Sequence, residues 1–353
     1  MFEDLIVVDC STVLAGPSVG TFFAELGASV TKIENPVIPD VTRSWKLPSE
    51  NKDYPVSAYF SSVNYRKQYR KLYFADAAQR EQLIGLIRSA DIFLSNFKKG
   101  DAEKFGLTDA FLLEINPKLI IGKISGFGSE SDRVAYDLIL QAETGYMSMN
   151  GTPESGPVKM PVALIDVLAA HQLKEGILAA LLQRTQTGTG KVVSVSLYDA
   201  AICSLANQAS NYLMQNHIPQ RIGSLHPNIA PYGELFQTQD GKSLTFAIGS
   251  NRHFQILCDY LELPGLAADP RFAENAERVT NRTVLRELIQ EVIANKHSEE
   301  LLEFMHRHFV PAGLIKNLQE VFEEPGSQRL IRTETIEGIE TRRITQLAFQ
   351  LIP

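Results

Sequence analysis

Asp166 lies where an apolar stretch runs into a strongly helical segment. Residues 161–191 have the sequence PVALIDVLAAHQLKEGILAALLQRTQTGTGK, so apolar residues flank this carboxylate on both sides. Partial loss of hydration makes a carboxylate more reactive, which identifies Asp166 as a candidate nucleophile for covalent catalysis. Taken alone, the position also suits a helix N-cap, because aspartate is a preferred capping residue.

The elements that must position Asp166 begin with alternating strand and helix signals. Short apolar runs at 5–8, 30–33, 92–94 and 119–124 predict strands, and residues 19–26 and 83–87 carry apolar side chains at helical spacing. Such alternation predicts an α/β fold with a parallel sheet covered by helices on both faces. The first turn, AGPSVG, lacks the G-x-G-x-x-G spacing of a nicotinamide or flavin site.

The pattern of the chain changes near residue 228. Before it, residues 192–197 predict a strand and residues 198–213 an apolar helix. After it, runs at 232–237 and 243–248 flank Asp240-Gly241, which predicts a β-hairpin. Helices are predicted around 254–261, 285–294, 299–308 and 318–322, with Ser298 as the N-cap of the third. The alternating stretch from Gln328 predicts a strand that returns to the first lobe.

These patterns, with a length of 353 residues, predict two domains. We expect a large α/β domain over 1–200, a linker over 201–226, a small α+β domain over 227–315, and a linker with a C-terminal return to the large domain over 316–353.

Composition excludes several classes of protein. With 44% hydrophobic and 21% charged residues the chain is globular, and its net charge of -7 argues against nucleic acid as a partner. The three cysteines are far apart and predict neither disulfides nor a zinc site, and no His cluster has metal-ligand spacing. The N-terminus lacks a basic leader and no apolar run is long enough to cross a membrane, so we expect a cytoplasmic protein.

Five short patterns occur together and in order along the chain. They are Ala15-Gly16-Pro17; Leu26-Gly27-Ala28 with Lys32-Ile33-Glu34; Ser125-Gly126-Phe127-Gly128; Tyr136-Asp137 with Gln141-Ala142; and Asp166 before GILAALLQRTQTGTG. In this order and spacing the sequence closely resembles the class III CoA-transferases, which include formyl-CoA:oxalate and carnitine CoA-transferases and related acyl-CoA racemases. The segments RIGSLHPNIAPYGELFQTQDG and DPRFAENAERVTNR extend the resemblance into the second domain.

The resemblance implies an interlocked homodimer of subunits with a Rossmann-like large domain and a small domain. It also implies a reaction: an aspartate attacks an acyl-CoA thioester to form a mixed anhydride, CoA moves to the aspartate as a thioester, and a free carboxylic acid then takes the CoA. Asp166 is the matching position. Asp137 is expected to orient groups near Asp166, or to cap a helix.

Coenzyme A, bound as the acyl-CoA substrate, is the cofactor that the resemblance implies, and no metal is expected. The positions that match the family's CoA contacts are Val13, Ala15, Gly16, Lys67, Asn96, Phe97, Lys104 and Tyr136. The two lysines would neutralise phosphates, the first-turn backbone would bind the pantetheine arm, and Tyr136 offers a flat apolar face with a hydroxyl. A solvated surface is the alternative explanation for the lysines.

Two departures from the family pattern bear on the reaction. Formyl-CoA transferases carry a glutamine where this chain has Leu14, which argues against the formyl and oxalate pair. Racemases of the superfamily place a histidine where this chain has Tyr136, and a tyrosine does not readily shuttle protons near neutral pH. The sequence therefore favours a CoA-transferase, with an α-methylacyl-CoA racemase or a catalytically inactive CoA-binding protein as the alternatives.

Overall fold

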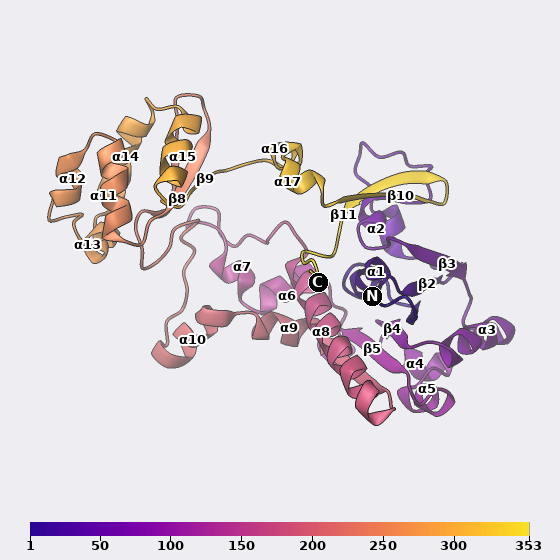
Figure 1. The fold of residues 1–353 in the computed structure, drawn as a ribbon. Coiled ribbons are helices and arrows are strands. Elements are labelled where there is room, and N and C mark those ends of the chain that lie inside the picture. The colour runs from indigo at the N-terminus through magenta and orange to yellow at the C-terminus, as the bar shows by residue number, and fades with distance from the viewer. Residues whose placement is uncertain (353) are drawn as a thin grey trace. The chain divides into compact units, whose positions relative to one another are not determined.

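The computed structural model describes residues 1–352, which form two compact units (Figure 1). Unit 1 comprises residues 1–148 and 159–219 together with the C-terminal segment from 329, and unit 2 comprises 149–158 and 220–328. Residues 201–219, which the sequence assigns to a linker, lie in unit 1. Residues 316–328, also expected in a linker, lie in unit 2, and so does the short internal segment 149–158.

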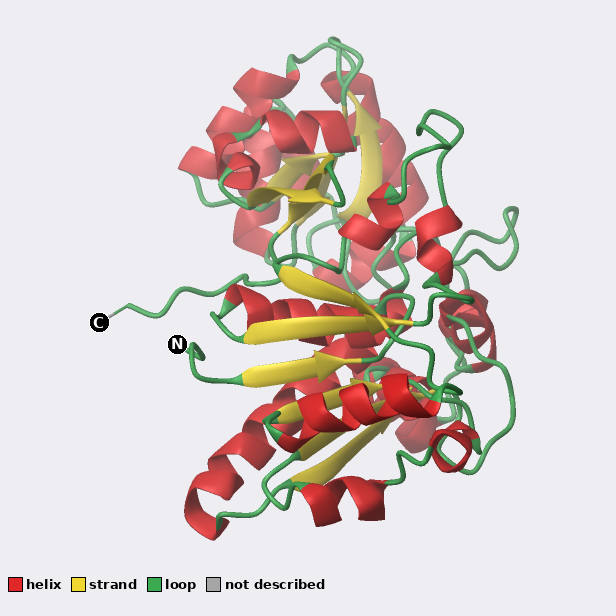
Figure 2. Cartoon of the chain, turned by 90° about the vertical axis from the view of Figure 1, so that its right-hand side faces the viewer, coloured by secondary structure: helices red, strands yellow, loops and turns green. Residues whose placement is uncertain are grey.

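The core of unit 1 is a six-stranded sheet whose neighbouring strands are all parallel (Figure 2). Its strand order is β3 (Lys67–Lys71), β2 (Ser29–Glu34), β1 (Ile6–Asp9), β4 (Ile92–Ser95), β5 (Ile120–Ser125) and β6 (Lys191–Ser196). The parallel α/β fold predicted from the sequence is confirmed. The strand β3 was not predicted, because its sequence KQYRK contains no apolar run.

Helices cover both faces of this sheet because its central strands are apolar on both sides. In β1 and β4, alternate residues enter two different apolar cores: Val7, Ile92 and Leu94 join one, and Val8 and Phe93 join the other. The first core contains residues of α1 (Ala15–Glu25), α8 (Leu164–Thr187) and α9 (Leu197–Cys203). The second contains residues of α3 (Ala77–Arg88) and α5 (Asp109–Ile115).

The long helix α8 is the element that carries Asp166. It begins at Leu164 after an Ala163 that makes no side-chain cap, and it ends at Thr187, followed by the C-cap Gly188, whose φ of 72° suits glycine. A Cβ at Gly176 would collide with Val193 of β6, so this glycine allows the helix to approach the sheet closely. Asp166 is therefore the third residue of the helix, and the N-cap alternative is wrong.

The remaining elements of unit 1 are short. They are η1 (Val41–Ser44), α2 (Ala58–Ser61), α4 (Asp101–Phe105), α6 (Asp137–Glu143), α7 (Tyr146–Met149), α10 (Ala206–Gln215), β10 (Ile331–Ile336) and β11 (Ile339–Ile344). The single helix expected over 198–213 is two helices, α9 and α10, and Ala206 at their junction has a positive φ of 48°. The C-terminal strands pair with each other as an antiparallel hairpin, and Ile336 packs against Phe60 of α2.

Unit 2 contains an antiparallel sheet of β7 (Tyr232–Gln237), β8 (Ser243–Ala247) and β9 (Ala312–Leu314), so the predicted hairpin is confirmed. Its helices are α11 (Asn251–Tyr260), α12 (Pro264–Ala268), α13 (Asn275–Thr280), α14 (Arg282–Ile293), α15 (Ser298–Arg307), α16 (Leu318–Glu323) and α17 (Pro325–Gln328). The predicted N-cap Ser298 is wrong, because the N-cap of α15 is His297. The Ser298 hydroxyl instead donates a 2.7 Å hydrogen bond to Asp240 in the hairpin turn.

Candidate active site

Asp166 is a partly buried carboxylate in the first turn of α8. Burial and, to a smaller extent, the nearby charge of Asp137 together raise its pKa to about 7. Both causes make the ionised form less stable than a carboxylate in water and correspondingly more basic. The carboxylate therefore has the poor solvation that a nucleophile at this position requires.

Asp137 ties the start of α8 to α6. Its Oδ1 accepts a 2.7 Å hydrogen bond from the N–H of Ile165, and its Oδ2 accepts a 2.6 Å bond from Nε2 of Gln141. The other atom of that amide, Oε1 of Gln141, accepts a 2.8 Å bond from the N–H of Met160. The first N–H groups of a helix have no partner within the helix, so Asp137 satisfies one of them from outside. Asp137 thus has a capping contact and also lies close enough to Asp166 to affect its charge.

Tyr59 of α2 belongs to the same site, although the sequence does not single it out. Burial and, to a smaller extent, the charges of Asp166, Asp137 and Asp40 together raise the pKa of its phenol to about 12. Its ring packs edge-on against Trp45 at 5.1 Å between centroids, and Trp45 lies 6.3 Å from the half-exposed ring of Tyr136. Of this aromatic group the sequence analysis names only Tyr136, and Trp45 stands out in the sequence only as the single tryptophan of the chain.

The turn between β1 and α1 gathers several of the predicted CoA contacts. Strands β1 and β4 are neighbours, but β2 and β3 lie on one side of this pair and β5 and β6 on the other. Such a reversal of strand order is called a topological switch point, and ligands of α/β proteins bind there, beyond the carboxyl ends of the strands. The side chain of Asn96, just after β4, bonds both backbone groups of Thr12 at 3.0 Å. The structure therefore holds Asn96 against Thr12, the neighbour of Val13 in this turn.

Ala15 and Gly16 form the first turn of α1 and are buried. A Cβ at Gly16 would collide with the side chain of Ser11, so this glycine is needed for the close packing of α1 on the turn. Contacts from these two residues to a ligand would have to come from the backbone.

Lys67 has a different environment from the one expected of a phosphate contact. Its side chain is fully buried, and its Nζ donates to Oδ2 of Asp9 at 2.8 Å. Three further oxygens accept from the same nitrogen at 2.8–3.0 Å, namely those of Pro17, Val63 and Asn64. A lysine ammonium has three protons, so this nitrogen already has more acceptors than protons. These contacts argue against the phosphate contact and favour a structural role for Lys67, which begins the edge strand β3 and pairs with Asp9 of β1.

Phe97 and Lys104 lie on the segment that follows β4. The half-buried ring of Phe97 packs against Phe105 at 5.7 Å, and also against Phe74 and Phe93 at 6.3 Å each. Lys104 is exposed on α4, with its Nζ 5.6 Å from the centre of the Phe105 ring. Of the two predicted lysines, Lys104 alone presents its charge to solvent.

Residues 1–352 are the part of the chain that the structure describes. In that range no group of three or more His, Cys, Asp or Glu side chains could hold a metal ion. Over the same residues no helix is long and apolar enough to span a membrane.

Comparison with known proteins places this chain in a family. The model of CoA-transferase family III matches residues 2–351. A succinate–glutarate CoA-transferase of Agrobacterium fabrum is 36% identical over 331 residues, which cover 91% of this chain and 82% of that protein. An acetyl-CoA:oxalate CoA-transferase of Acetobacter aceti is 33% identical over 328 residues, covering 92% of this chain and 83% of that protein.

A solved structure shows the same relationship. A CAIB/BAIF family protein from Brucella suis matches this chain with a TM-score of 0.86 at 34% sequence identity, covering 99% of this chain and 92% of that one. The family match over nearly the whole chain confirms the resemblance found in the sequence motifs. The chain belongs to CoA-transferase family III.

Proposed function

We propose that Asp166 is the nucleophile with which this enzyme moves CoA from an acyl-CoA to a free carboxylic acid. The observation that carries the proposal is the place of this carboxylate: it lies partly buried in the first turn of α8, where burial and the charge of Asp137 raise its pKa to about 7. Near neutral pH such a group is ionised in a large part of the molecules and is a stronger nucleophile than a hydrated carboxylate.

The reaction proceeds in two symmetric halves. An oxygen of Asp166 attacks the thioester carbonyl, the C–S bond breaks, and a mixed anhydride and CoA thiolate are formed. The thiolate then attacks the Asp166 carbonyl of the anhydride, giving an aspartyl-CoA thioester and releasing the donor acid as a carboxylate. The acceptor carboxylate reverses these steps, taking the CoA and regenerating Asp166. No net proton or electron is required.

The residues around Asp166 supply positions for the two substrates. Asp137 fixes the first turn of α8, so that the nucleophile is held in one place. We propose that CoA is bound by residues of the first turn, by residues of the segment that follows β4, and by Tyr136. These residues are Val13, Ala15, Gly16, Asn96, Phe97, Lys104 and Tyr136. Lys67 is left out because its ammonium is already bound within the protein.

Small dicarboxylic acids are the proposed acids of the reaction. The support comes from the relatives, whose names include succinate, glutarate and oxalate as substrates. The hydroxyl of Tyr59 lies within electrostatic range of both site carboxylates and is the side-chain donor that we propose for the acid.

A homodimer is the proposed assembly. Helix α10 has no buried residue, and its end exposes Leu213 at 78% and Met214 at 75%. Exposed apolar groups of this kind mark surfaces that a partner covers.

Intact-protein mass spectrometry after brief incubation with succinyl-CoA, glutaryl-CoA and acetyl-CoA tests the mechanism. Wild type should gain the mass of CoA or of the acyl group on Asp166, and Asp166→Ala should gain nothing and lose at least about a thousandfold in activity. Asp199→Ala is the matched control, because Asp199 is likewise the third residue of its helix but is exposed.

Exchange of the α-proton in deuterated water without any adduct would contradict the proposal and indicate a racemase. CoA binding with neither adduct nor exchange would contradict it in favour of an inactive CoA-binding protein.

A further inference from the structure

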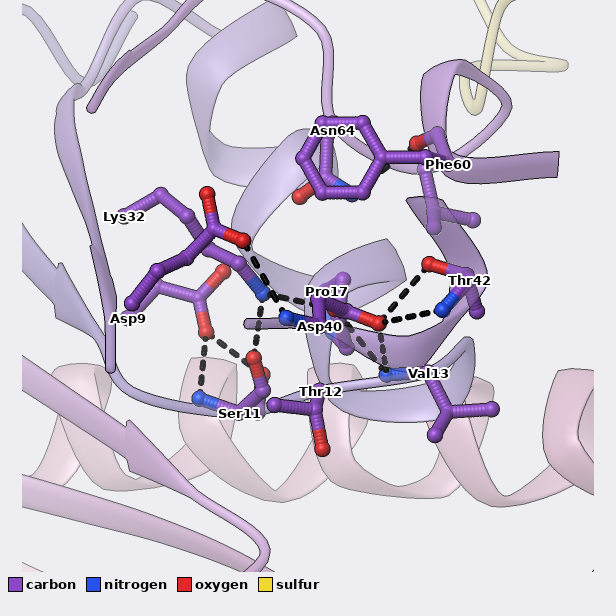
Figure 3. A network of polar contacts seen from close by, with 12 residues as sticks. Asp9, Ser11, Thr12, Val13, Pro17, Lys32, Asp40, Thr42, Phe60 and Asn64 are labelled. Atoms are coloured by element: carbon purple, nitrogen blue, oxygen red, sulfur yellow. Dashed lines mark hydrogen bonds and ion pairs between the residues drawn. The ribbon is translucent and has the colours of Figure 1, made fainter. Parts of the chain in front are cut away.

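The turn between β1 and α1 is held by side chains from several other segments (Figure 3). Lys32 of β2 donates to the carbonyl of Ser11, and Asn96 after β4 bonds both backbone groups of Thr12. The N–H of Val13 points at Asp40, whose two carboxylate oxygens lie 3.3 and 3.2 Å away. Three successive backbone units of the turn are therefore fixed from outside it.

Val13 is the strained member of this turn. Its φ of 72° lies in the left-handed region, which a β-branched side chain rarely occupies. Such a conformation persists only where surrounding contacts enforce it, and it is found most often at functional sites. The bond from the Val13 N–H to Asp40 is a charge-assisted contact of the kind that can enforce it.

Asp40 is itself held in place by contacts within the protein. Its side chain is fully buried and lies 3.3 Å from the ammonium of Lys32. The N–H and hydroxyl of Thr42 donate to its Oδ1 at 3.1 and 2.7 Å, and its own N–H donates to Glu34 at 3.3 Å. Because Lys32 and Thr42 occupy much of the accepting capacity of the carboxylate, it faces the N–H of Val13 in one orientation.

We propose that Asp40 is a positioning residue for acyl-CoA: it holds Val13 in its left-handed conformation, so that the backbone of the turn is preformed for the substrate. The inference rests on the proposed function, in which this turn binds CoA. Asp40 also lies within electrostatic range of Tyr59, which in turn feels the charge of Asp166.

Replacement of Asp40 by asparagine tests the proposal, because the N–H of Val13 is shared between both carboxylate oxygens, and asparagine removes the charge and puts an NH2 group in place of one of them. Asp40→Asn should raise the Kd of free CoA, measured by calorimetry, and the KM of the acyl-CoA by about tenfold, with a much smaller change in the KM of the acceptor acid. Glycine adopts positive φ without strain, so Val13→Gly in the Asp40→Asn background should recover most of the lost affinity. Val13→Ala in that background should recover none.

Glu25→Gln is the matched control. Glu25 is a buried carboxylate of α1 that pairs with Arg343 and accepts bonds from Thr345 and Gln346 at 2.9 and 2.7 Å. Its loss should lower the thermal midpoint while leaving the acyl-CoA KM unchanged. If Asp40→Asn does not fold, Asp40→Glu replaces it, because it keeps a charge opposite Lys32 but moves the carboxylate relative to Val13.

Three outcomes would overturn the inference. The first is an unchanged CoA affinity in Asp40→Asn while wild type still forms its adduct, which leaves the proposed function intact. The second is an equal rise of KM in Glu25→Gln, which would show a general effect of lost stability. The third is a loss of affinity that Val13→Gly does not restore. Wild type that neither binds CoA nor forms an adduct would overturn the proposed function as well.

Discussion

The carboxylate of Asp137 accepts a 2.7 Å hydrogen bond from the N–H of Ile165, the residue that directly precedes Asp166. One aspartate thus anchors the backbone next to the candidate nucleophile and also raises its pKa through charge. These two effects have different consequences, because a neutral side chain of the same shape keeps the first and removes the second.

Asp137→Asn should therefore shift the pH dependence of the reaction. A nucleophilic Asp166 must be ionised, so kcat/KM of wild type should rise with pH through the pKa of about 7. Removal of the neighbouring charge lowers that pKa, and the acid limb should move to lower pH. Glu143→Gln, at the other end of α6, is the control that should leave the limb in place. An acid limb that stays at the same pH in Asp137→Asn would show that the two carboxylates do not interact.

Asp166 should destabilise the fold at neutral and alkaline pH. The folded state keeps a proton on Asp166 up to a pKa of about 7, whereas the unfolded chain loses it near the ordinary value of 3.8. The folded state binds more protons between these values, so this contribution to stability is lost as pH rises from about 4 to about 7. Asp166→Asn should match wild type at pH 4 and exceed it at pH 8 by up to about 4 kcal/mol in urea unfolding. Equal stability of the two proteins at pH 8 would argue that Asp166 is well hydrated.

Replacement of Lys67 should change the stability of the fold, whereas replacement of Lys104 should change the affinity for CoA. Lys67→Met leaves the buried charge of Asp9 without its partner and should lower the free energy of unfolding by roughly 3–5 kcal/mol. Lys104→Ala removes an exposed cation and should leave stability unchanged while weakening CoA binding about three- to tenfold. Chemical unfolding and calorimetric titration with CoA measure the two effects. A Lys67→Met protein as stable as wild type would show that the buried ion pair does not contribute.

The apolar end of α10 should be covered in an assembly. Light scattering should give twice the 39.2 kDa mass of the chain for wild type. The double variant Leu213→Asp and Met214→Asp places two charges on this surface and should shift the mass toward the monomer. Val284→Asp, at an exposed apolar position of α14, is the control expected to leave the mass unchanged. A wild-type mass of 39.2 kDa at all concentrations would contradict the homodimer.

The parts of the fold that the sequence predicts are those with strong local patterns. Apolar runs identified five strands of the parallel sheet, and Asp240-Gly241 identified the hairpin of unit 2. The strand β3 was missed because its edge position needs no apolar run. The break within the helix predicted over 198–213 was missed, because no glycine or proline marks the junction at Ala206.

Within the site, the sequence by itself determined the candidate nucleophile, since apolar neighbours along the chain already predict poor solvation for Asp166. Only the tertiary structure decided that Tyr59 lies near that carboxylate, that Lys67 is buried against Asp9, and that Asp40 holds the N–H of Val13. These contacts join residues that are 27 to more than 100 positions apart. Which of these residues come into contact depends on the order of the strands in the sheet and on where the loops that follow the strands meet. No pattern of neighbouring residues along the chain specifies this.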